Sequence, residues 1–103
     1  MKKPLEKEIQ KSILDYLKLK GYMAWKNSTV GIFNKKSGGY IPSQSVGAPD
    51  IFMLTKGVFW GIEVKTPTGK LSDNQKHFGG NIKANGGKYL VAYSVDDVIK
   101  AGL

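Results

Sequence analysis

Apolar residues recur at three- and four-residue spacing near the start of the chain, and this pattern predicts an amphipathic helix from Leu5 to about Lys20. The repeating positions are Leu5, Ile9, Ile13, Leu14 and Leu17. Gly21 follows and is suited to ending a helix, because glycine tolerates the left-handed backbone conformation found there. The next residues, Tyr22 to Lys26, are predicted to form a short strand.

The middle of the chain contains two apolar segments, Ile51 to Thr55 and Val58 to Lys65, which predict a pair of strands. Lys56-Gly57 separates them and suits a tight turn, so we expect an antiparallel hairpin. The stretch before this pair, residues 27–49, is rich in glycine, proline, serine and threonine. It is predicted to be a long loop or a loosely structured hairpin.

Two further helices are indicated by residues that favour helix starts. Ser72 and Gln75 have the spacing of a capping box, which predicts a helix that runs to about Asn85 and ends at Gly86-Gly87. Residues 88–93 follow as a β-branched and aromatic strand. Ser94 then opens a short C-terminal helix with acids in its first turn. The predicted order is helix, three strands, helix, strand and helix, which is an α/β chain.

The length and composition limit the possible classes of protein. The chain has 103 residues, of which 41% are hydrophobic, so we expect a single domain covering residues 1–103. It contains no cysteine, which excludes disulfide scaffolds, zinc fingers, iron–sulfur sites and thiol nucleophiles. No apolar run is long enough to span a membrane, and the charged N-terminal stretch does not resemble a signal peptide. We therefore expect a cytoplasmic protein, encoded by a cell, a virus or a phage.

The charge balance points to a polyanionic partner. All sixteen basic residues are lysine, against eight acids, and the formal net charge is +8. Such an excess favours nucleic acid first and an anionic membrane surface second. Lysine is a point charge suited to phosphates, whereas the reading of guanine edges is mainly a role of arginine. If the partner is DNA, we expect recognition of its backbone and shape rather than its sequence.

Three charged residues of the predicted hairpin could form a metal site. Glu63 and Lys65 project from the same face of their strand, and antiparallel pairing would bring Asp50 close to Glu63. Two carboxylates are hard oxygen ligands suited to Mg²⁺ or Mn²⁺. The simpler alternative is an exposed ion pair between Glu63 and Lys65. The apolar character of both strands favours the metal site, because an unpaired charge in a covered strand is costly.

The first helix offers a third carboxylate. Glu6 precedes Ile9 by three residues and Ile13 by seven, so it shares the apolar face of the helix, whereas Glu8 points to the opposite side. Glu6 is therefore the acid expected to face inward. The alternative is that Glu6 only interacts favourably with the helix dipole in the first turn.

These residues belong to an ordered set of motifs that resembles a known nuclease family. The segments are Gly47-Ala-Pro-Asp50, Ile62-Glu63-Val64-Lys65, Gly69-Lys-Leu-Ser-Asp-Asn-Gln75 and Gly86-Gly87-Lys-Tyr89. Together they resemble the PD-(D/E)XK nuclease superfamily and, within it, the virus-type replication-repair nuclease (VRR-NUC) family, from Glu6 to about Val98. The resemblance implies a restriction-endonuclease-like αβββαβ core, with a central mixed sheet flanked by helices and a short C-terminal helix.

The resemblance also implies roles for the site residues. Asp50 and Glu63 correspond to the metal-binding carboxylates, with the Val64 main-chain carbonyl as a further ligand of Mg²⁺ or Mn²⁺. Lys65 corresponds to the residue that orients or activates the attacking water and steadies charge on the phosphate. Glu6 corresponds to a helix-borne acid that holds a water beside the metal, with Glu8 as the alternative.

The next helix carries two further candidates. Gln75 matches the family's active-site glutamine, so the catalytic set is Glu6, Asp50, Glu63, Lys65 and Gln75. Its position also suits a simple helix cap, and both roles remain open. His77 is the single histidine of the chain and is interpreted as a surface residue of the helix.

Lysines near the glycine-rich segment are candidates for holding the nucleic-acid backbone. They are Lys26, Lys35, Lys36 and Lys70. Each could equally be a solvated surface charge. Phe33 and Tyr40 could stack on an unpaired base or anchor the loop.

The function expected from the resemblance is a metal-dependent DNA endonuclease that acts on branched DNA such as Holliday junctions. Standalone members of the family resemble junction-cleaving enzymes, and a homodimer would place two sites on the symmetric strands of a four-way junction. The alternative is a basic binding module for branched DNA in which the carboxylates are structural. A third possibility, a structural subunit, does not explain the set of two acids and a lysine.

Overall fold

The computed structural model describes residues 3–27, 32–34, 39–41 and 46–103. A four-stranded sheet forms its centre, with strand order β1-β4-β5-β6. These strands span Met23–Lys26 (β1), Ile51–Thr55 (β4), Val58–Val64 (β5) and Lys88–Ala92 (β6). β1 pairs antiparallel with β4, and β4 pairs antiparallel with β5. Because β5 and β6 run parallel, the sheet is mixed. This architecture confirms the expected α/β core.

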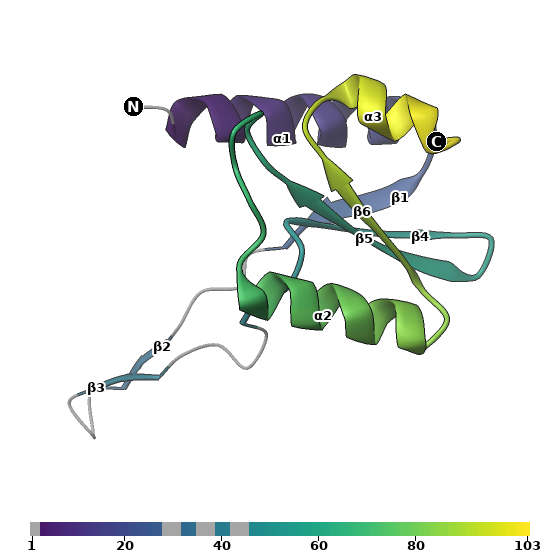
Figure 1. The fold of residues 1–103 in the computed structure, drawn as a ribbon. Helices are drawn as coiled ribbons and strands as arrows, with labels where there is room; N and C mark the ends of the chain where they lie inside the picture. The colour runs from purple at the N-terminus through teal and green to yellow at the C-terminus, as the bar shows by residue number, and fades with distance from the viewer. Residues whose placement is uncertain (1–2, 28–31, 35–38, 42–45) are drawn as a thin grey trace.

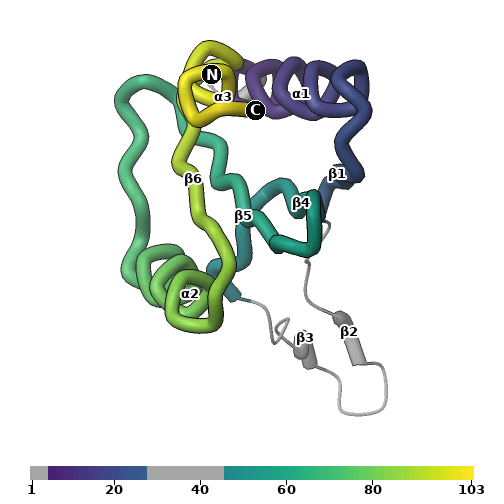
Figure 2. Tube along the Cα trace, turned by 90° about the vertical axis from the view of Figure 1, so that its right-hand side faces the viewer, coloured from purple at the N-terminus to yellow at the C-terminus, as the bar shows by residue number. Residues whose placement is uncertain are grey.

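Helices cover both faces of the sheet (Figure 1). Helices α1 (Lys3–Leu19) and α3 (Val95–Lys100) lie on one face, and α2 (Asp73–Ala84) lies on the other. The view along the sheet in Figure 2 shows the same three layers. None of the helices in the described part of the chain is long and apolar enough to cross a membrane.

The hydrophobic core lies between the sheet and the layer formed by α1 and α3. Ile13 and Leu17 of α1 and Val98 of α3 are fully buried against the sheet. The core side chains of the strands include Ile51, Met53, Ile62, Val64 and Ala92. Burial of each large aliphatic side chain contributes about 1.5–3 kcal/mol relative to exposure. The apolar face predicted for the first helix is therefore the face that packs on the sheet.

The hairpin of β4 and β5 closes as the sequence predicts. Lys56 and Gly57 both have positive φ, 51° and 78°, as a two-residue turn that matches the twist of the strands requires. The register pairs Ile51 with Ile62, so the beginning of β4 lies beside the end of β5. This register places Asp50, the residue before β4, next to the charged residues at the end of β5.

The segment between β1 and β4 contains two short strands, β2 (Ile32–Asn34) and β3 (Gly39–Ile41). They pair with each other antiparallel and form a separate two-stranded sheet. Of the two alternatives for this segment, the hairpin is confirmed. Phe33 and Tyr40 are partners in its register.

Candidate active site

The end of β5 and the loop before β4 bring two carboxylates together. Val64 donates its backbone N–H to Asp50 Oδ2 at 2.8 Å, so the Asp50 side chain lies directly beside β5. Glu63 is the residue before Val64, and Asp50 and Glu63 are close enough for a hydrogen bond between their carboxyl groups when one is protonated. The expected meeting of Asp50 and Glu63 is confirmed.

The backbone of Asp50 is held by the end of β1. Asn27 donates its backbone N–H to the Asp50 carbonyl at 2.8 Å and its side-chain amide to the Pro49 carbonyl at 3.0 Å. These bonds extend the pairing of β1 and β4 by one residue and fix the direction in which Asp50 leaves the loop. Asn27 is a positioning residue that the sequence analysis missed, because its role depends on a partner far along the chain.

Glu63 is the one buried charged residue in the described part of the chain, with 2% of its surface exposed. Burial, followed by the negative charge of Asp50, raises the pKa of Glu63 to about 8, while the positive charge of Lys65 opposes the shift. The alternative of an exposed ion pair is therefore wrong for Glu63. A carboxylate in this position needs a proton or a cation.

Lys65 and Gln75 contact the same oxygen of Glu63. Lys65 Nζ lies 3.9 Å from Glu63 Oε2, and its side chain is 16% exposed. Gln75 donates its side-chain amide to Glu63 Oε2 at 2.9 Å. The other oxygen, Oε1, is buried and has no hydrogen-bond partner in the described structure. The described residues thus hold one side of the Glu63 carboxylate.

Gln75 forms the helix cap and also contacts the carboxylate of Glu63. Its backbone N–H donates to Ser72 Oγ at 3.2 Å, and its side-chain oxygen accepts from the Ser72 N–H at 2.8 Å, which is a complete capping box. The same side chain uses its NH₂ group to reach Glu63. The cap therefore fixes the rotamer of the glutamine that contacts the site.

Close packing explains two glycines near the carboxylates. Gly47 has φ of 87°, and a Cβ atom there would collide with the backbone carbonyl of Asn74 in the first turn of α2. A Cβ atom on Gly61 would lie 2.6 Å from Cγ of Pro49. Only glycine lets the loop that carries Asp50 pack against both α2 and β5. These contacts hold the loop and the helix of Gln75 in one arrangement.

The two acids of α1 have different surroundings. Glu6 is half-buried and lies near enough to Glu63 for its charge to raise the pKa of Glu63, although it is the weakest of the contributions. Glu8 is exposed and lines a shallow depression with Ser94 and Val95, at the α3 side of the helix. The expected inward orientation of Glu6 agrees with this arrangement.

Tyr89 supports the site from β6. Its hydroxyl donates to the Gln75 carbonyl at 3.5 Å. Burial, with the charges of Glu63 and Asp50, raises the pKa of Tyr89 to about 12, so its hydroxyl stays protonated as a donor. Its ring packs against α2 at Gly79, where a Cβ atom would lie 2.6 Å from Cδ2 of the ring. The sequence contained this residue in the Gly86-Gly87-Lys-Tyr89 segment but gave no indication of its role.

The carboxylate pair fits a divalent cation. Within the described residues, no three His, Cys, Asp or Glu side chains gather closely enough to hold a metal ion by themselves. Mg²⁺ commonly takes one or two carboxylates and completes its shell with water and substrate phosphates, so two carboxylates suffice. The unpartnered Glu63 Oε1 supports this fit, because a buried carboxylate oxygen without a donor or cation is costly.

The remaining predicted residues are exposed on the surface or lie outside the described residues. Lys26 ends β1, and Lys70 is exposed in the connection between β5 and α2. Lys35 and Lys36 lie outside the described residues. His77 is exposed on α2, in agreement with its interpretation as a surface residue.

Comparison with known proteins identifies a match over most of the chain. The model of the VRR-NUC domain family matches residues 6–96. This range includes every described site residue, from Glu6 to Tyr89. A search of curated proteins finds no match.

Proposed function

The chain belongs to the VRR-NUC family of nuclease domains, and from this premise and the geometry of its site we propose that it is a metal-dependent endonuclease selective for branched DNA. The substrate class follows from the family, since a nuclease-type domain acts on DNA. The dependence on a metal ion, the selectivity for branched DNA and the roles of the site residues are proposed.

The observation that carries the proposal is the asymmetric environment of Glu63. One carboxylate oxygen accepts a hydrogen bond from Gln75 and lies near Lys65, while the other is buried and lacks a donor in the described structure. A purely structural buried glutamate would be expected to have both oxygens satisfied. Mg²⁺ or Mn²⁺ would be held by Asp50, Glu63 and the main-chain carbonyl of Val64. When bound, the cation supplies charge neutralisation and Lewis acidity for phosphodiester hydrolysis.

The protein's own residues provide the rest of the chemistry. Lys65 carries a positive charge near the carboxylates, where it steadies the negative charge that develops on the phosphate and orients the attacking water. Gln75 keeps the Glu63 carboxylate in a single orientation through its amide. Glu6 reaches the same region from α1 and holds a water molecule, with Glu8 facing elsewhere.

Lysine side chains hold the DNA through its backbone. Lys26, Lys35, Lys36 and Lys70 are the proposed nucleic-acid contacts, and the absence of arginine from the chain favours contacts to phosphates over contacts to bases. Selectivity must then come from the shape of the substrate. A homodimer with two sites would match the two-fold symmetry of a four-way junction.

The competing function is a binding module for branched DNA without catalysis. The two functions are distinguished by incubating the protein with labelled linear, flap, splayed and four-way DNA in Mg²⁺, in Mn²⁺ and in EDTA. The proposal requires cleavage in the divalent cations, no cleavage in EDTA, and faster cleavage of branched substrates. Binding without cleavage of any substrate in either metal would favour the module.

A further inference from the structure

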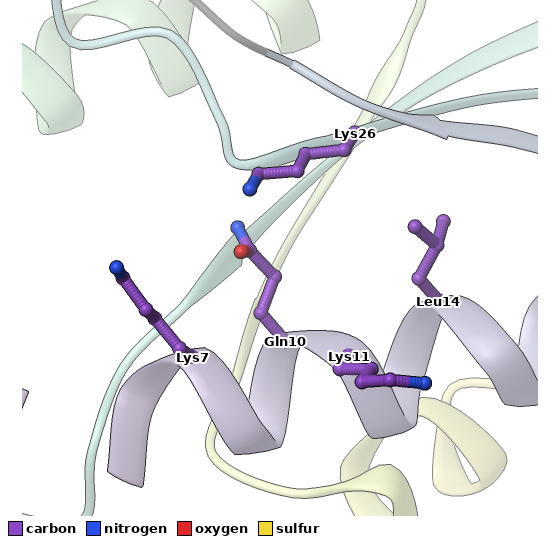
Figure 3. A pocket seen from close by; sticks show the side chains of 5 residues that line it. All are labelled: Lys7, Gln10, Lys11, Leu14 and Lys26. Atoms are coloured by element: carbon purple, nitrogen blue, oxygen red, sulfur yellow. The ribbon is translucent and has the colours of Figure 1, made fainter. Parts of the chain in front are cut away.

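A second cluster of polar side chains lies in a pocket between α1 and β1. The pocket has a volume of about 310 Å³, and its lining residues are Lys7, Gln10, Lys11, Leu14 and Lys26. Figure 3 shows Gln10 of α1 and Lys26 of β1 reaching into the same space from opposite sides, with Lys7 beside them. Lys11 instead extends along the helix, away from these three.

Among the residues that the structure describes, the two lysines that face this space have no ion-pair partner. Lys11 pairs with Asp15 at 2.8 Å, one turn along α1. In the described part of the chain, neither Lys7 nor Lys26 forms an ion pair with a carboxylate. Two ammonium groups that share a pocket repel each other unless an anion lies between them. The Gln10 amide adds a neutral hydrogen-bond donor suited to the same anion.

The pocket lies at the same end of the sheet as the carboxylates. Lys26 pairs with Ile51, the residue that follows Asp50, and Asn27 bonds to the Asp50 backbone. On α1, Gln10 lies four residues after Glu6, so the two side chains occupy neighbouring positions on one helix face, about 6 Å apart along the axis. A DNA strand that is bound at Asp50 and Glu63 and continues toward α1 and β1 would pass this pocket.

We propose that Lys7, Gln10 and Lys26 form a subsite for a backbone phosphate of the cleaved strand, close to the phosphate that is hydrolysed. The inference rests on the proposed nuclease function and deepens it. Lysine binds phosphate as a point charge, and Gln10 donates a hydrogen bond that fixes the phosphate's position. The subsite sets which phosphate of the strand lies at the carboxylates, and hence the cleavage position.

The test compares two double variants that remove the same number of charges. The double variant Lys7→Ala/Lys26→Ala removes the two lysine side chains that face the pocket. Lys11→Ala with Lys100→Ala is the matched control, because both of its lysines are exposed and paired with an acid at i,i+4. Affinity for a four-way junction is measured in EDTA against salt concentration, so that binding is separated from cleavage. Each lost phosphate contact should reduce the slope of log affinity against log salt by about 1.

The pocket variant should lose more affinity than the control and show the shallower slope. A second measurement replaces single phosphates near the cleavage position with neutral methylphosphonates. One replacement should weaken binding of the wild-type protein and leave binding of the pocket variant unchanged. Equal losses for the two double variants, or no position with this dependence, would overturn the subsite while leaving the nuclease function intact. No DNA binding by the wild-type protein would instead contradict the proposed function.

Discussion

Glu63 is the single residue whose surroundings most clearly favour either a proton or a cation. The apolar strand around Glu63 was enough to predict that this side chain is covered. The alternation of side chains along the strand was enough to predict that Lys65 projects from the same face. The contacts of Asn27 and Tyr89 could not be predicted in this way, because they join segments distant in the sequence. The requirement for glycine at position 47 could not be predicted either. The motif around Gly47 was recognised, but the collision of a Cβ atom with α2 is evident only once the two segments are packed together.

The pH dependence of the free energy of unfolding should reflect the raised pKa of Glu63. Its pKa is raised from 4.5 to about 8 in the folded protein. Between these values the folded state binds more protons than the unfolded state, so the free energy of unfolding of the metal-free protein falls as pH rises through this window. Mg²⁺ needs the deprotonated carboxylate, so the increase in Tm that it causes should be larger at about pH 9 than at about pH 6. Thermal unfolding at both pH values measures this difference.

Glu63→Gln is the control for the pH dependence. Glutamine keeps the size of the side chain and does not titrate, so the variant should lose this part of the pH dependence and most of the Mg²⁺ effect. An equal Mg²⁺ effect on Tm at the two pH values in the wild-type protein would contradict the assignment of Glu63 as a metal ligand.

At the scale of elements, the start of α2 connects local helix chemistry to the site. The capping box was predictable because it depends on residues three apart in sequence. The contact between Gln75 and Glu63 was not predictable from the sequence, because a cap role and an active-site role for Gln75 were treated as alternatives. The hairpin of β4 and β5 and the face of α1 were also predictable, from alternation and helical periodicity.

The helix cap formed by Gln75 and its contact with Glu63 can be separated by substitution. Ser72→Ala removes the cap acceptor and should cost about 1 kcal/mol of stability. It leaves the amide contact of Gln75 with Glu63 available, so most of the cleavage activity should remain. Gln75→Ala removes both contacts and should lower stability and cleavage together. Urea unfolding and cleavage rates, measured on both variants, test this expectation. Comparable losses of cleavage in the two variants would mean that the glutamine acts only as a cap.

The register of α1 predicts which of its acids contributes to cleavage. Glu6 lies near Glu63, whereas Glu8 is exposed on the side of α3. Glu6→Gln should therefore slow cleavage, and Glu8→Gln should be nearly silent, in single-turnover assays with the protein in excess of the DNA and above the dissociation constant. The reverse result would show that Glu8 performs the function proposed for Glu6.

At the scale of the whole molecule, the net charge of +8 is carried without arginine. This composition indicated a nucleic-acid partner from the sequence alone, and the family match agrees with it. Composition does not reveal how the charges are arranged. The convergence of Lys7 and Lys26 in one pocket depends on the packing of α1 beside β1, which residue spacing could not predict.

Backbone recognition by lysine should make the protein selective for DNA shape. We predict that it is a homodimer and prefers four-way or otherwise branched DNA to linear duplex of the same sequence, with weak dependence on base composition. Light scattering under active conditions measures the oligomeric state, and competition binding measures the preference. A monomer, or a linear duplex that displaces the branched DNA at equal concentration, would contradict this expectation.

Asp50 and Glu63 are proposed to hold the cation that permits cleavage. The most direct test is the cleavage of a labelled four-way junction at saturating Mg²⁺ by the wild-type protein, Asp50→Ala and Glu63→Ala, with circular dichroism and junction binding recorded for each. We expect cleavage by the wild-type protein alone, while both variants remain folded and bind the junction. Full cleavage by either folded variant would contradict this expectation.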